Sequence, residues 1–386
     1  MITFCIPSKN NLRYLKTCIK SIREKSYYSI SNRIIVYVDQ DNDGTEEWLI
    51  NSDLMYEGDK IIVNSSNSPK GIGYAYDAMF KEATTDLVVA FHADMVLGTY
   101  GDLGLLEHYD GRKSIVCATR IEPPLHPPGP EKIVKDFGMW PEDIKWHEFD
   151  KFVTSQWDQH REDFTKGLFA PWMIDKRDHL GHDSIFKSVY EDADLFRRFA
   201  LAGYNIKQSW GSYVYHLTCR GGQFADANKM EDFNKKSPEW QHNNEISLKE
   251  YIRKWGGLFK EYGPCEPKPN TKYNIGLEVT SCNSNILNVE PFFNQLKVDC
   301  DYNNYIDSEK NNTSYNLNDK FVEELTTDII LKYDLSLDTI NSFYYIVNNL
   351  EDILENAESN SAYNLDPCLL IVKDKKIHNP KINLNE

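Results

Sequence analysis

The sequence predicts an α/β fold built on a mostly parallel sheet, followed by a smaller α+β part. In about the first hundred residues, short β-rich runs alternate with amphipathic stretches of helical period, which is typical of parallel strands joined by crossover helices. Polar or glycine-containing turns follow the strand-like runs, at the edge where open α/β sheets bind ligands. A chain of 386 residues, 41% of them hydrophobic, also exceeds the usual size of one compact domain, so two domains are expected.

The elements of the first part are expected to alternate regularly. Strands are expected at Ile2–Ile6, Ile34–Val38, Lys60–Val63, Leu87–Phe91, Leu168–Ile174 and Ser212–His216. Helices are expected at Asn11–Glu24, Thr45–Leu54, Gly71–Ala83, Trp146–Glu162 and Glu191–Ala202. The proline- and glycine-rich segment Ile121–Pro141 is expected to be a long loop, either an ordered one near a site or a passive one on the surface.

The two expected domains cover residues 1–262 and 272–386. The stretch GPCEPKPNT between them is rich in proline and polar residues, as domain boundaries often are. In the second part, strands are expected at Tyr273–Cys282, Leu331–Leu335 and Cys368–Val372, and helices at Val289–Leu296 and Asp338–Leu354. This small α+β module has no cluster of catalytic residue types, so we expect it to bind an acceptor or to mediate oligomerisation.

The composition excludes some partners and compartments. A formal charge of −16 opposes binding to long nucleic acids, which requires clustered Lys and Arg. The eight cysteines are scattered without metal-ligand spacing, so they are expected to be reduced thiols. Neither a signal peptide nor an apolar run of about 18 residues is recognisable, and we therefore expect a cytoplasmic protein without a membrane span.

Asp39 ends a predicted strand in the sequence VYVDQDNDGTEEW. Its carboxylate could accept a hydrogen bond from the imide of a uracil or from a ribose hydroxyl, while a plain turn is an equally good explanation. Asp43 and Glu46 have the spacing of a helix capping box, which accounts for those two residues without a ligand.

Asp94 follows a buried strand in TTDLVVAFHADMVLG and has no Lys or Arg neighbour. Because a buried carboxylate without a partner is costly, Asp94 is the leading candidate for a metal ligand. His92 lies two residues earlier, on the same side of an extended chain. It could be a second ligand, a hydrogen-bond donor to a sugar or phosphate, or a packed core histidine.

Glu191, Asp192 and Asp194 begin a predicted amphipathic helix in SVYEDADLFRRFALAGYNI. The helix dipole alone accounts for Glu191, whereas Asp192 and Asp194 form a denser acidic group. A carboxylate at a helix N-terminus stays ionised at neutral pH, as a general base for an acceptor hydroxyl must. Asp192 is therefore the candidate base.

His216 ends a further β-rich run, in SYVYHLTCRGGQF. Although a lone histidine is more often structural, His216 and Arg220 together offer a metal ligand and a phosphate-pairing guanidinium, followed by a glycine pair. The run from Gly71 to Gly73 lacks the remaining residues of a dinucleotide fingerprint or of a P-loop, so neither motif is predicted.

Taken in order, these clusters resemble the family 2 glycosyltransferases of the GT-A fold. The family pattern of Pro-x-x-Asn, Val-Asp-Asp with Asp-Gly-Thr, Asp-x-Asp, Glu-Asp-x-Asp-Leu and a late His is matched by IPSKN, VDQDNDGT, FHADM, YEDADLFRR and VYH. LGHDSIF is similar to the family's Gly-Gly-Phe-Asp segment. The resemblance covers residues 2–260, and the order of five weak motifs is more specific than any one of them.

The resemblance implies roles for individual residues. Asp39 would contact the nucleobase, Asp94 would hold Mn²⁺ or Mg²⁺ on the diphosphate, Asp192 would be the catalytic base, and His216 would complete the metal shell. The nucleotide-sugar site is expected to include Pro7, Lys9, Asn10, Asp39, Asp41, Gly71, Gly73, His92 and Arg220. Two departures leave roles open: VDQDNDGT is one residue shorter than usual, which affects Asp41, and His92 replaces the first Asp of Asp-x-Asp. Nitrogen ligation by His92 would favour Mn²⁺.

The resemblance implies transfer of a hexose from a nucleoside diphosphate sugar, with UDP as the expected nucleotide, to a hydroxyl-bearing glycan, protein or small molecule. Inversion at the anomeric carbon is expected. A retaining enzyme of the same fold and a noncatalytic protein that binds carbohydrate or nucleotide are the alternatives, and a sugar nucleotidyltransferase is disfavoured because no glycine-rich, lysine-bearing loop is present near the N-terminus.

Overall fold

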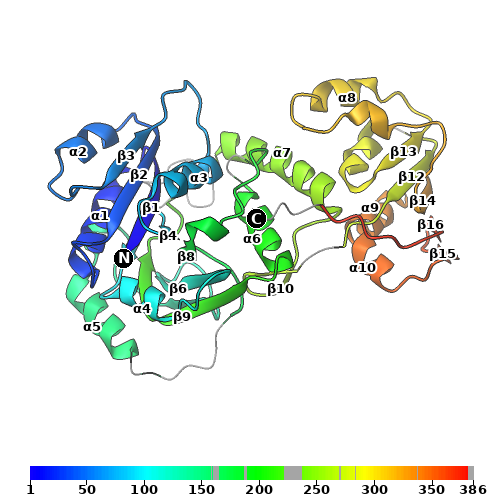
Figure 1. The fold of residues 1–386 in the computed structure, drawn as a ribbon. Helices are drawn as coiled ribbons and strands as arrows, with labels where there is room; N and C mark the ends of the chain where they lie inside the picture. Colours follow the sequence, from blue (N-terminus) through cyan, green and yellow to red (C-terminus); the bar gives the residue numbers. More distant parts are fainter. Residues whose placement is uncertain are drawn as a thin grey trace. The chain divides into compact units, whose positions relative to one another are not determined.

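A computed structural model describes residues 1–157, 159, 165–186, 189–220, 237–268, 271–282, 284–336 and 338–380. The chain forms two compact units, which are drawn in Figure 1. Of the described residues, 1–242 and 261–267 belong to the N-terminal unit, and 243–260 and 268–380 belong to the C-terminal unit. Whether the expected ranges 1–262 and 272–386 are independent domains stays a prediction.

The N-terminal unit is organised around a nine-stranded sheet with the order β3-β2-β1-β4-β8-β6-β9-β5, in which β7 pairs with β6. Its strands are β1 (Ile2–Lys9), β2 (Arg33–Gln40), β3 (Lys60–Val63), β4 (Leu87–Ala90), β5 (Met95–Leu97), β6 (Ser114–Glu122), β7 (Lys132–Val134), β8 (Trp172–Asp175) and β9 (Asn205–His216). The strands β3, β2, β1 and β4 are parallel, β8 is antiparallel to both of its neighbours, and β9 is parallel to β6. The carboxyl ends of β1, β2, β4, β6 and β9 therefore meet at one edge of the sheet, as Figure 1 lets the reader follow.

Helices cover both faces of this sheet. Its helices are α1 (Leu12–Lys25), α2 (Thr45–Asn51), α3 (Ile72–Glu82), α4 (Gly101–Glu107), α5 (Trp146–Gln156) and α6 (Glu191–Leu201). On one face, buried side chains of α1, α2 and α4 pack with inward residues of β1, β2 and β4. On the other face, α3 and α6 contribute Met79 and Phe199 to a second core. A sheet covered on both faces explains why its strands are continuous apolar runs.

The main departure from the expected elements is β6. This strand crosses the middle of the sheet, and its last two residues, Ile121 and Glu122, had been expected to begin a long loop. Two Pro residues follow Glu122 directly, and they obscured the strand end in the sequence. The expected strand Leu168–Ile174 is shorter, as β8, and the expected helix Trp146–Glu162 ends at Gln156 as α5, with residues 160–162 outside the described part of the chain.

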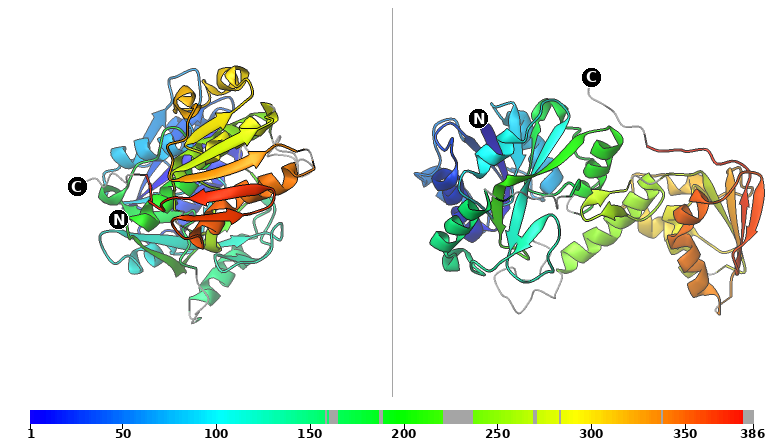
Figure 2. Two further views of the ribbon diagram at one scale, coloured as in Figure 1. Left: turned by 90° about the vertical axis from the view of Figure 1, so that its right-hand side faces the viewer. Right: turned by 90° about the horizontal axis from the view of Figure 1, so that it is seen from below.

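The C-terminal unit contains a five-stranded mixed sheet with the order β13-β12-β14-β16-β15, whose strands can be followed in the left view of Figure 2. Its strands are β12 (Ile275–Thr280), β13 (Gln295–Val298), β14 (Ile329–Asp334), β15 (Ser361–Asn364) and β16 (Cys368–Val372), and its helices include α8 (Asn303–Glu309), α9 (Ile340–Asn348) and α10 (Leu350–Glu355). The segment Val289–Leu296, expected as one helix, is instead the end of a 3₁₀ helix, η4 (Ser284–Phe292), followed by β13. Pro291 lacks the N–H that an α-helix would need there, which explains the difference.

Cysteine pairing also differs from expectation. The structure joins Cys282 to Cys300 by a disulfide, and this corrects the prediction that all eight cysteines are reduced. The cysteines Cys5, Cys18, Cys117, Cys219, Cys265 and Cys368 are free thiols. Among the described residues, no helix has both the length and the apolar character that a membrane span requires.

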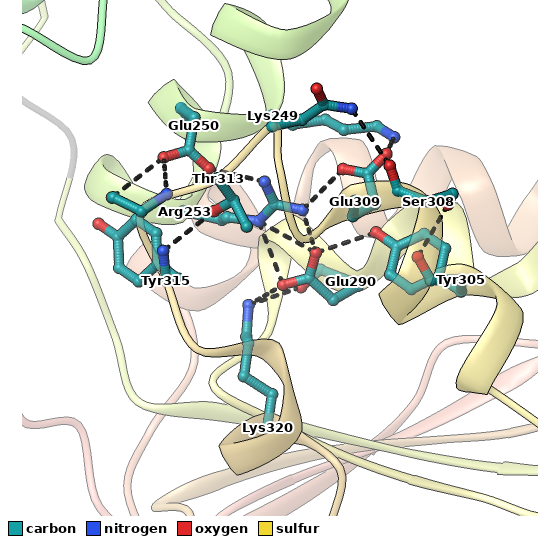
Figure 3. A network of polar contacts seen from close by, with 12 residues as sticks. Lys249, Glu250, Arg253, Glu290, Tyr305, Ser308, Glu309, Thr313, Tyr315 and Lys320 are labelled. Atoms are coloured by element: carbon teal, nitrogen blue, oxygen red, sulfur yellow. Dashed lines mark hydrogen bonds and ion pairs between the residues drawn. The ribbon is translucent and has the colours of Figure 1, made fainter.

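A buried network of charges joins helix α7 (Pro238–Trp255) to the rest of the C-terminal unit, as Figure 3 shows. The Arg253 side chain is 1% exposed, and it donates to Glu250 Oε1 at 2.7 Å and to Glu290 Oε2 at 2.5 Å. Its Nη2 also reaches Glu309 Oε2 at 3.2 Å, while Lys320 pairs with Glu290. The carboxylates of Glu250 and Glu290 are fully buried; Glu250 is balanced by this guanidinium, and Glu290 is balanced by it together with Lys320.

We expect Arg253→Ala to destabilise the C-terminal unit by about 3–5 kcal/mol, because it leaves the buried Glu250 without its cation and Glu290 with Lys320 alone. Calorimetry of the full chain measures this loss as a lower unfolding temperature for one transition. The matched control is Lys310→Ala, which breaks an ion pair whose side chains are 58% and 70% exposed. Its cost should be about 0–1 kcal/mol. Equal effects of the two substitutions would contradict the role given to Arg253.

Candidate active site

Three residues expected at the sheet edge converge in the structure. Asp94 lies in the connection between β4 and β5, directly before Met95, which pairs with His216 at the end of β9. The distance from Asp94 Oδ2 to His216 Nε2 is 3.7 Å. Ligating atoms of His92, Asp94 and His216 all lie within 4.8 Å of one another, so this metal triad offers two nitrogens and one oxygen.

Glu122 supports the triad from behind. Its Oε1 lies 2.9 Å from His216 Nδ1, so that Nε2 is the ring nitrogen turned toward Asp94. The Glu122 side chain is 3% exposed and also pairs with Lys132 Nζ at 3.0 Å. Burial acts to raise the pKa of Glu122, but His216, Arg120 and Lys132 lower it to about 2. A carboxylate that orients a histidine through its second nitrogen is a common support of metal ligands.

The charge states of the triad suit a cation. Burial lowers the pKa of His92 to about 4, so its ring is neutral at pH 7 and has a free lone pair. Burial also acts to lower the pKa of His216, but Asp94 and Glu122 raise it to about 9. The pKa of Asp94 is lowered, chiefly by His216, in spite of burial. In the absence of a metal ion, a proton on His216 therefore supplies the positive charge between two carboxylates.

Asp39 is buried at the end of β2 and fixes the segment that leads into α3. Its Oδ1 accepts hydrogen bonds from Asn64 Nδ2 at 2.9 Å and from the Lys70 N–H at 2.8 Å. Its Oδ2 accepts the N–H of Gly71 at 3.0 Å. Gly71 has a φ of +89° and directly precedes α3, which explains the glycine at this position. The structure thus brings Asp39 and Gly71 together, with three protein donors on the carboxylate.

Asp41 caps the N-terminus of α2, a role that the sequence analysis gave to Asp43. Its carboxylate accepts the N–H groups of Thr45 at 2.8 Å and Glu46 at 2.9 Å, and so caps α2. Burial opposes the shift, but these backbone donors lower the pKa of Asp41. Asp43 instead accepts the Leu12 N–H at 2.8 Å at the start of α1, so the expected capping box of Asp43 with Glu46 was wrong.

The remaining candidates of the N-terminal segment lie near the same edge. Pro7 is in β1 opposite Tyr37, and Lys9 ends the strand with its Nζ 3.6 Å from Glu239 Oε1. Asn10 has a φ of +53° and accepts the Asn42 N–H through its side chain at 2.7 Å.

Arg220 and Gly73 are packed against the protein. Arg220 is buried, donates to the Met139 carbonyl at 2.6 Å, and lies over the Trp140 ring at 4.3 Å. The glycines at 221 and 222 lie outside the described residues. A Cβ on Gly73 would come within 2.9 Å of His182 Cβ, so glycine is required there for close packing.

The acidic motif begins α6. Because α6 ends close to the start of β9, its first turn points toward the carboxyl edge of the sheet. Asp192 is solvent-exposed, whereas Asp194 is fully buried and bound to Arg198 Nε at 2.9 Å. Asp194 therefore does not join Asp192 in the acidic group that the sequence suggested.

The carboxyl groups of Glu191 and Asp192 are neighbours, and the protonation of one affects the pKa of the other. Burial and the charge of Asp192 raise the pKa of Glu191 to about 8, so Glu191 carries a proton at neutral pH. The net shift of the Asp192 pKa is also upward: although the residue as a whole is exposed, surrounding protein atoms limit the solvation of its carboxyl group, and this outweighs the Ala193 N–H and His182, which lower the pKa. The helix dipole was expected to account for Glu191 and would favour its ionised form. Burial of the carboxyl group and the negative charge of Asp192 have a larger effect, and they raise its pKa.

Comparison with known protein families gives a match over the part of the chain that contains the first three of the motifs. Residues 3–159 match the family described as Glycosyl transferase family 2. No curated protein sequence matches the chain. GalNAc-T7 in complex with UDP, GalNAc and Mn²⁺ is one similar solved structure, with 12% identity, a TM-score of 0.46, and coverage of 66% of this chain and 48% of that one. The chain thus spans about half the length of GalNAc-T7.

Two further solved structures are similar at low identity. The UDP complex of residues 1–349 of S. aureus TarS has 12% identity and a TM-score of 0.38, and the match covers 66% of this chain and 71% of that one. The mannosyltransferase PcManGT from Pyrobaculum calidifontis, in complex with GDP-Man and Mn²⁺, has 14% identity and a TM-score of 0.40, with coverage of 65% and 62%.

The family match over residues 3–159, together with a sheet covered by helices on both faces, makes the N-terminal unit similar to the family 2 glycosyltransferases. A C-terminal module with its own sheet follows this unit. The α/β fold predicted from the sequence is confirmed.

We expect Glu191→Gln to stabilise the protein increasingly as pH rises. Glu191 has a pKa of about 8 in the folded protein, against about 4.3 in an unfolded chain. Between these two pH values the Glu191 carboxyl loses its proton in the unfolded chain but keeps it in the folded protein. The free energy of unfolding therefore falls as pH rises. Glutamine does not titrate, so the substitution removes this loss. The gain should be on the order of 1–2 kcal/mol at pH 8 and absent near pH 4.

Urea unfolding at a series of pH values measures this gain. A helix-dipole role alone gives the opposite sign, because loss of the charge would then cost about 0.3–1 kcal/mol. A loss of stability at pH 8 would therefore contradict the pKa assigned to Glu191.

Proposed function

We propose that the protein transfers a hexose from a nucleoside diphosphate sugar, with UDP as the nucleotide, to a hydroxyl-bearing acceptor, and that it needs a divalent metal ion. The observation that carries this proposal is the metal triad with its supporting Glu122, at the sheet edge toward which the first turn of α6 points. The acceptor is a glycan, a protein or a small molecule.

The donor set of the triad fits Mn²⁺. His92 is already neutral, Asp94 is ionised, and Glu122 fixes the ring of His216 with Nε2 turned toward Asp94. Mixed imidazole and carboxylate ligands suit Mn²⁺ better than Mg²⁺, which prefers oxygen. When bound, the ion supplies positive charge for the leaving diphosphate. Replacement of the first Asp of Asp-x-Asp by His92 thus retains a ligand and changes the preferred metal.

The other proposed donor contacts surround this edge. Asp39 holds the Asn64–Gly71 segment and would contact the nucleobase with its remaining acceptor capacity. Lys9 and Asn10 lie at the end of β1 beside it, on the path expected for the nucleotide. For Arg220 we propose a supporting role, because its guanidinium is bound to backbone carbonyls.

Asp192 is the proposed base, which gives inversion at the anomeric carbon. It would take the proton of the acceptor hydroxyl while the acceptor oxygen attacks that carbon and the bond to the diphosphate breaks. The protonated neighbour Glu191 leaves a single negative charge on the pair at neutral pH, so Asp192 is the carboxylate available to accept a proton. Analysis of the product anomer by NMR distinguishes this mechanism from retention.

The function is tested by a screen of nucleoside diphosphate sugars with Mn²⁺, which measures released nucleotide with and without sugar and peptide acceptors. Transfer from one donor is the expected result. Thermal protection by a nucleotide without release of product from any donor would favour a noncatalytic binding protein.

We expect Asp94→Asn to abolish metal-dependent binding of UDP, because it removes the anionic ligand of the triad. Glu122→Gln should weaken Mn²⁺ binding by about 10- to 100-fold, since His216 loses the partner that orients it. Calorimetric titration of UDP with and without Mn²⁺ measures both effects. Asp53→Asn is the matched control, because Asp53 is an exposed carboxylate of the same unit. Unchanged Mn²⁺-dependent affinity in Asp94→Asn would disprove the metal assignment.

Asp192→Asn should lower turnover by about two to four orders of magnitude and leave donor affinity nearly unchanged, because only the proton acceptor is lost. Glu191→Gln should reduce turnover far less, since glutamine resembles the protonated acid. Initial rates and calorimetric donor affinity, determined on the same preparations, separate chemistry from binding. If Glu191→Gln is inactive and Asp192→Asn is active, the base is Glu191.

A further inference from the structure

A second group of possible metal ligands lies between α3 and the segment that follows β8, and it has no role so far. Asp77 on α3 and the histidines His179 and His182 each offer one ligand atom, and these atoms all lie within 4.8 Å of one another. His179 Nε2 and His182 Nδ1 are both 2.7 Å from the same atom, Asp77 Oδ1. The two ring nitrogens therefore converge on one point, as the ligands of a single ion do.

Aromatic packing fixes the two histidine rings in this orientation. The His179 ring meets Phe80 edge-on, with ring centroids 4.8 Å apart, and is stacked on Trp172 at 6.3 Å. The His182 ring is stacked on Tyr76, with ring centroids 6.1 Å apart. The two histidine side chains are 7% and 5% exposed. Because buried rings with fixed planes lose little conformational entropy when they bind an ion, these ligands are preorganised.

The backbone between the two histidines is also fixed by the protein. Gly181 has a φ of +69°, which residues other than glycine rarely adopt, and it lets the chain turn between His179 and His182. Arg198 of α6 donates to the Leu180 carbonyl at 3.2 Å and to the Gly181 carbonyl at 2.7 Å. The turn that presents both rings to Asp77 is therefore anchored on α6.

The Asp77 carboxylate is placed to act as the third ligand. The backbone N–H of His182 lies 2.9 Å from Oδ2 and 3.2 Å from Oδ1, and a hydrogen bond of this kind commonly orients a ligating carboxylate. Zn²⁺ binds nitrogen and oxygen at about 2.0–2.2 Å, which places tetrahedral ligand atoms roughly 3.3 Å apart. Oδ1 would have to withdraw from the rings by roughly 0.6 Å. The Asp77 side chain is 34% exposed, so it can make this shift and water can reach the fourth position.

We propose that Asp77, His179 and His182 bind one Zn²⁺ ion, with water as the fourth ligand, and that the ion fixes the segment His179–His182 to α3. Two imidazoles, one carboxylate and water form a donor set that Zn²⁺ accepts in tetrahedral geometry. His179 binds through Nε2 and carries its proton on Nδ1, whereas His182 binds through Nδ1 and carries its proton on Nε2. Two neutral rings thus bind the ion without net release of a proton. The role of this ion is structural, and the inference does not depend on the proposed function.

The segment that the ion would hold touches both helices near the acidic motif and the sheet edge. A Cβ on Gly73 of α3 would come within 2.9 Å of His182 Cβ, and Arg198 ties the same segment to α6. An ion between Asp77 and the two histidines would therefore connect α3 to a turn that α6 already holds. His182 belongs to LGHDSIF, which is similar to a family pattern without histidine, so this ligand is a feature of the present chain.

The test measures Zn²⁺ binding by the full chain in an Asp94→Asn background, in which the metal triad has lost its carboxylate. After metal is removed with a chelator, calorimetric titration of Asp94→Asn with Zn²⁺ should show one bound equivalent. Adding Asp77→Asn, which keeps the size of the side chain but removes the anionic ligand, should abolish this equivalent. Adding Asp53→Asn instead is the matched control and should leave it in place, because Asp53 is an exposed carboxylate of the same unit.

Two further measurements use the intact cluster of Asp94→Asn and do not require the Asp77 variant to fold. X-ray absorption of the bound Zn²⁺ should show four nitrogen or oxygen ligands, two of them imidazoles, at about 2.0–2.2 Å. Zn²⁺ at about 100 times its Kd should raise the unfolding temperature of the N-terminal unit by about 5–10 °C. If the three side chains are only a hydrogen-bonded support, Zn²⁺ will leave this temperature unchanged.

Three results would overturn the proposal. The first is the absence of a bound equivalent in Asp94→Asn, and the second is its retention after Asp77→Asn is added. The third is a Zn²⁺ shell with sulfur ligands at about 2.3 Å, which would place the ion on cysteines. None of these results bears on the proposed function, because release of nucleotide from a sugar donor with Mn²⁺ tests that function separately.

Discussion

The hydrogen bond from His216 to Glu122 is the interaction on which the candidate site depends. Glu122 is a buried carboxylate at the end of a central strand, and such a group is tolerated only with charged or hydrogen-bonding partners. Lys132 and His216 supply them, and the bond to His216 also fixes the edge of the ring that meets Asp94. Because β6 and β9 are adjacent and parallel, this support is part of the sheet itself.

The sequence predicted the location of site residues best where a residue follows directly from the end of one strand. Asp39, Asp94 and His216 were expected at carboxyl ends of strands, and the parallel order of the sheet places them at one edge. Glu122 was missed because its strand ends at a pair of prolines inside a segment rich in loop-forming residues, although SIVCATRI before it is an apolar run of strand length. Asp41, Gly73 and Arg220 have structural partners that only the tertiary arrangement defines.

The C-terminal unit could be predicted as α+β but not in detail. Short apolar strands such as β12 and β14 are recognisable because both are buried, while their neighbours β13 and β15 are more exposed and have little periodicity. The charged network around Arg253 was also invisible, since its members are far apart in the sequence and individually look like ordinary surface residues. Only when α7 packs on this unit do they become buried and interdependent.

The replacement of the first Asp of Asp-x-Asp by His92 has an electrostatic consequence for an acidic protein. A chain with a formal charge of −16 repels an anionic donor at long range, so the site must provide local positive charge. With His92 neutral, the triad contributes one carboxylate rather than two, so under the proposed function a divalent cation held there would keep more of its charge for the diphosphate. The acidic motif also has fewer negative charges than carboxyl groups. Glu191 retains its proton at neutral pH, and Asp192 alone is left to ionise. Under the proposed function, Asp94 is the ionised ligand of the triad and Asp192 the ionised member of the acidic pair, while His92 and Glu191 add no charge at neutral pH.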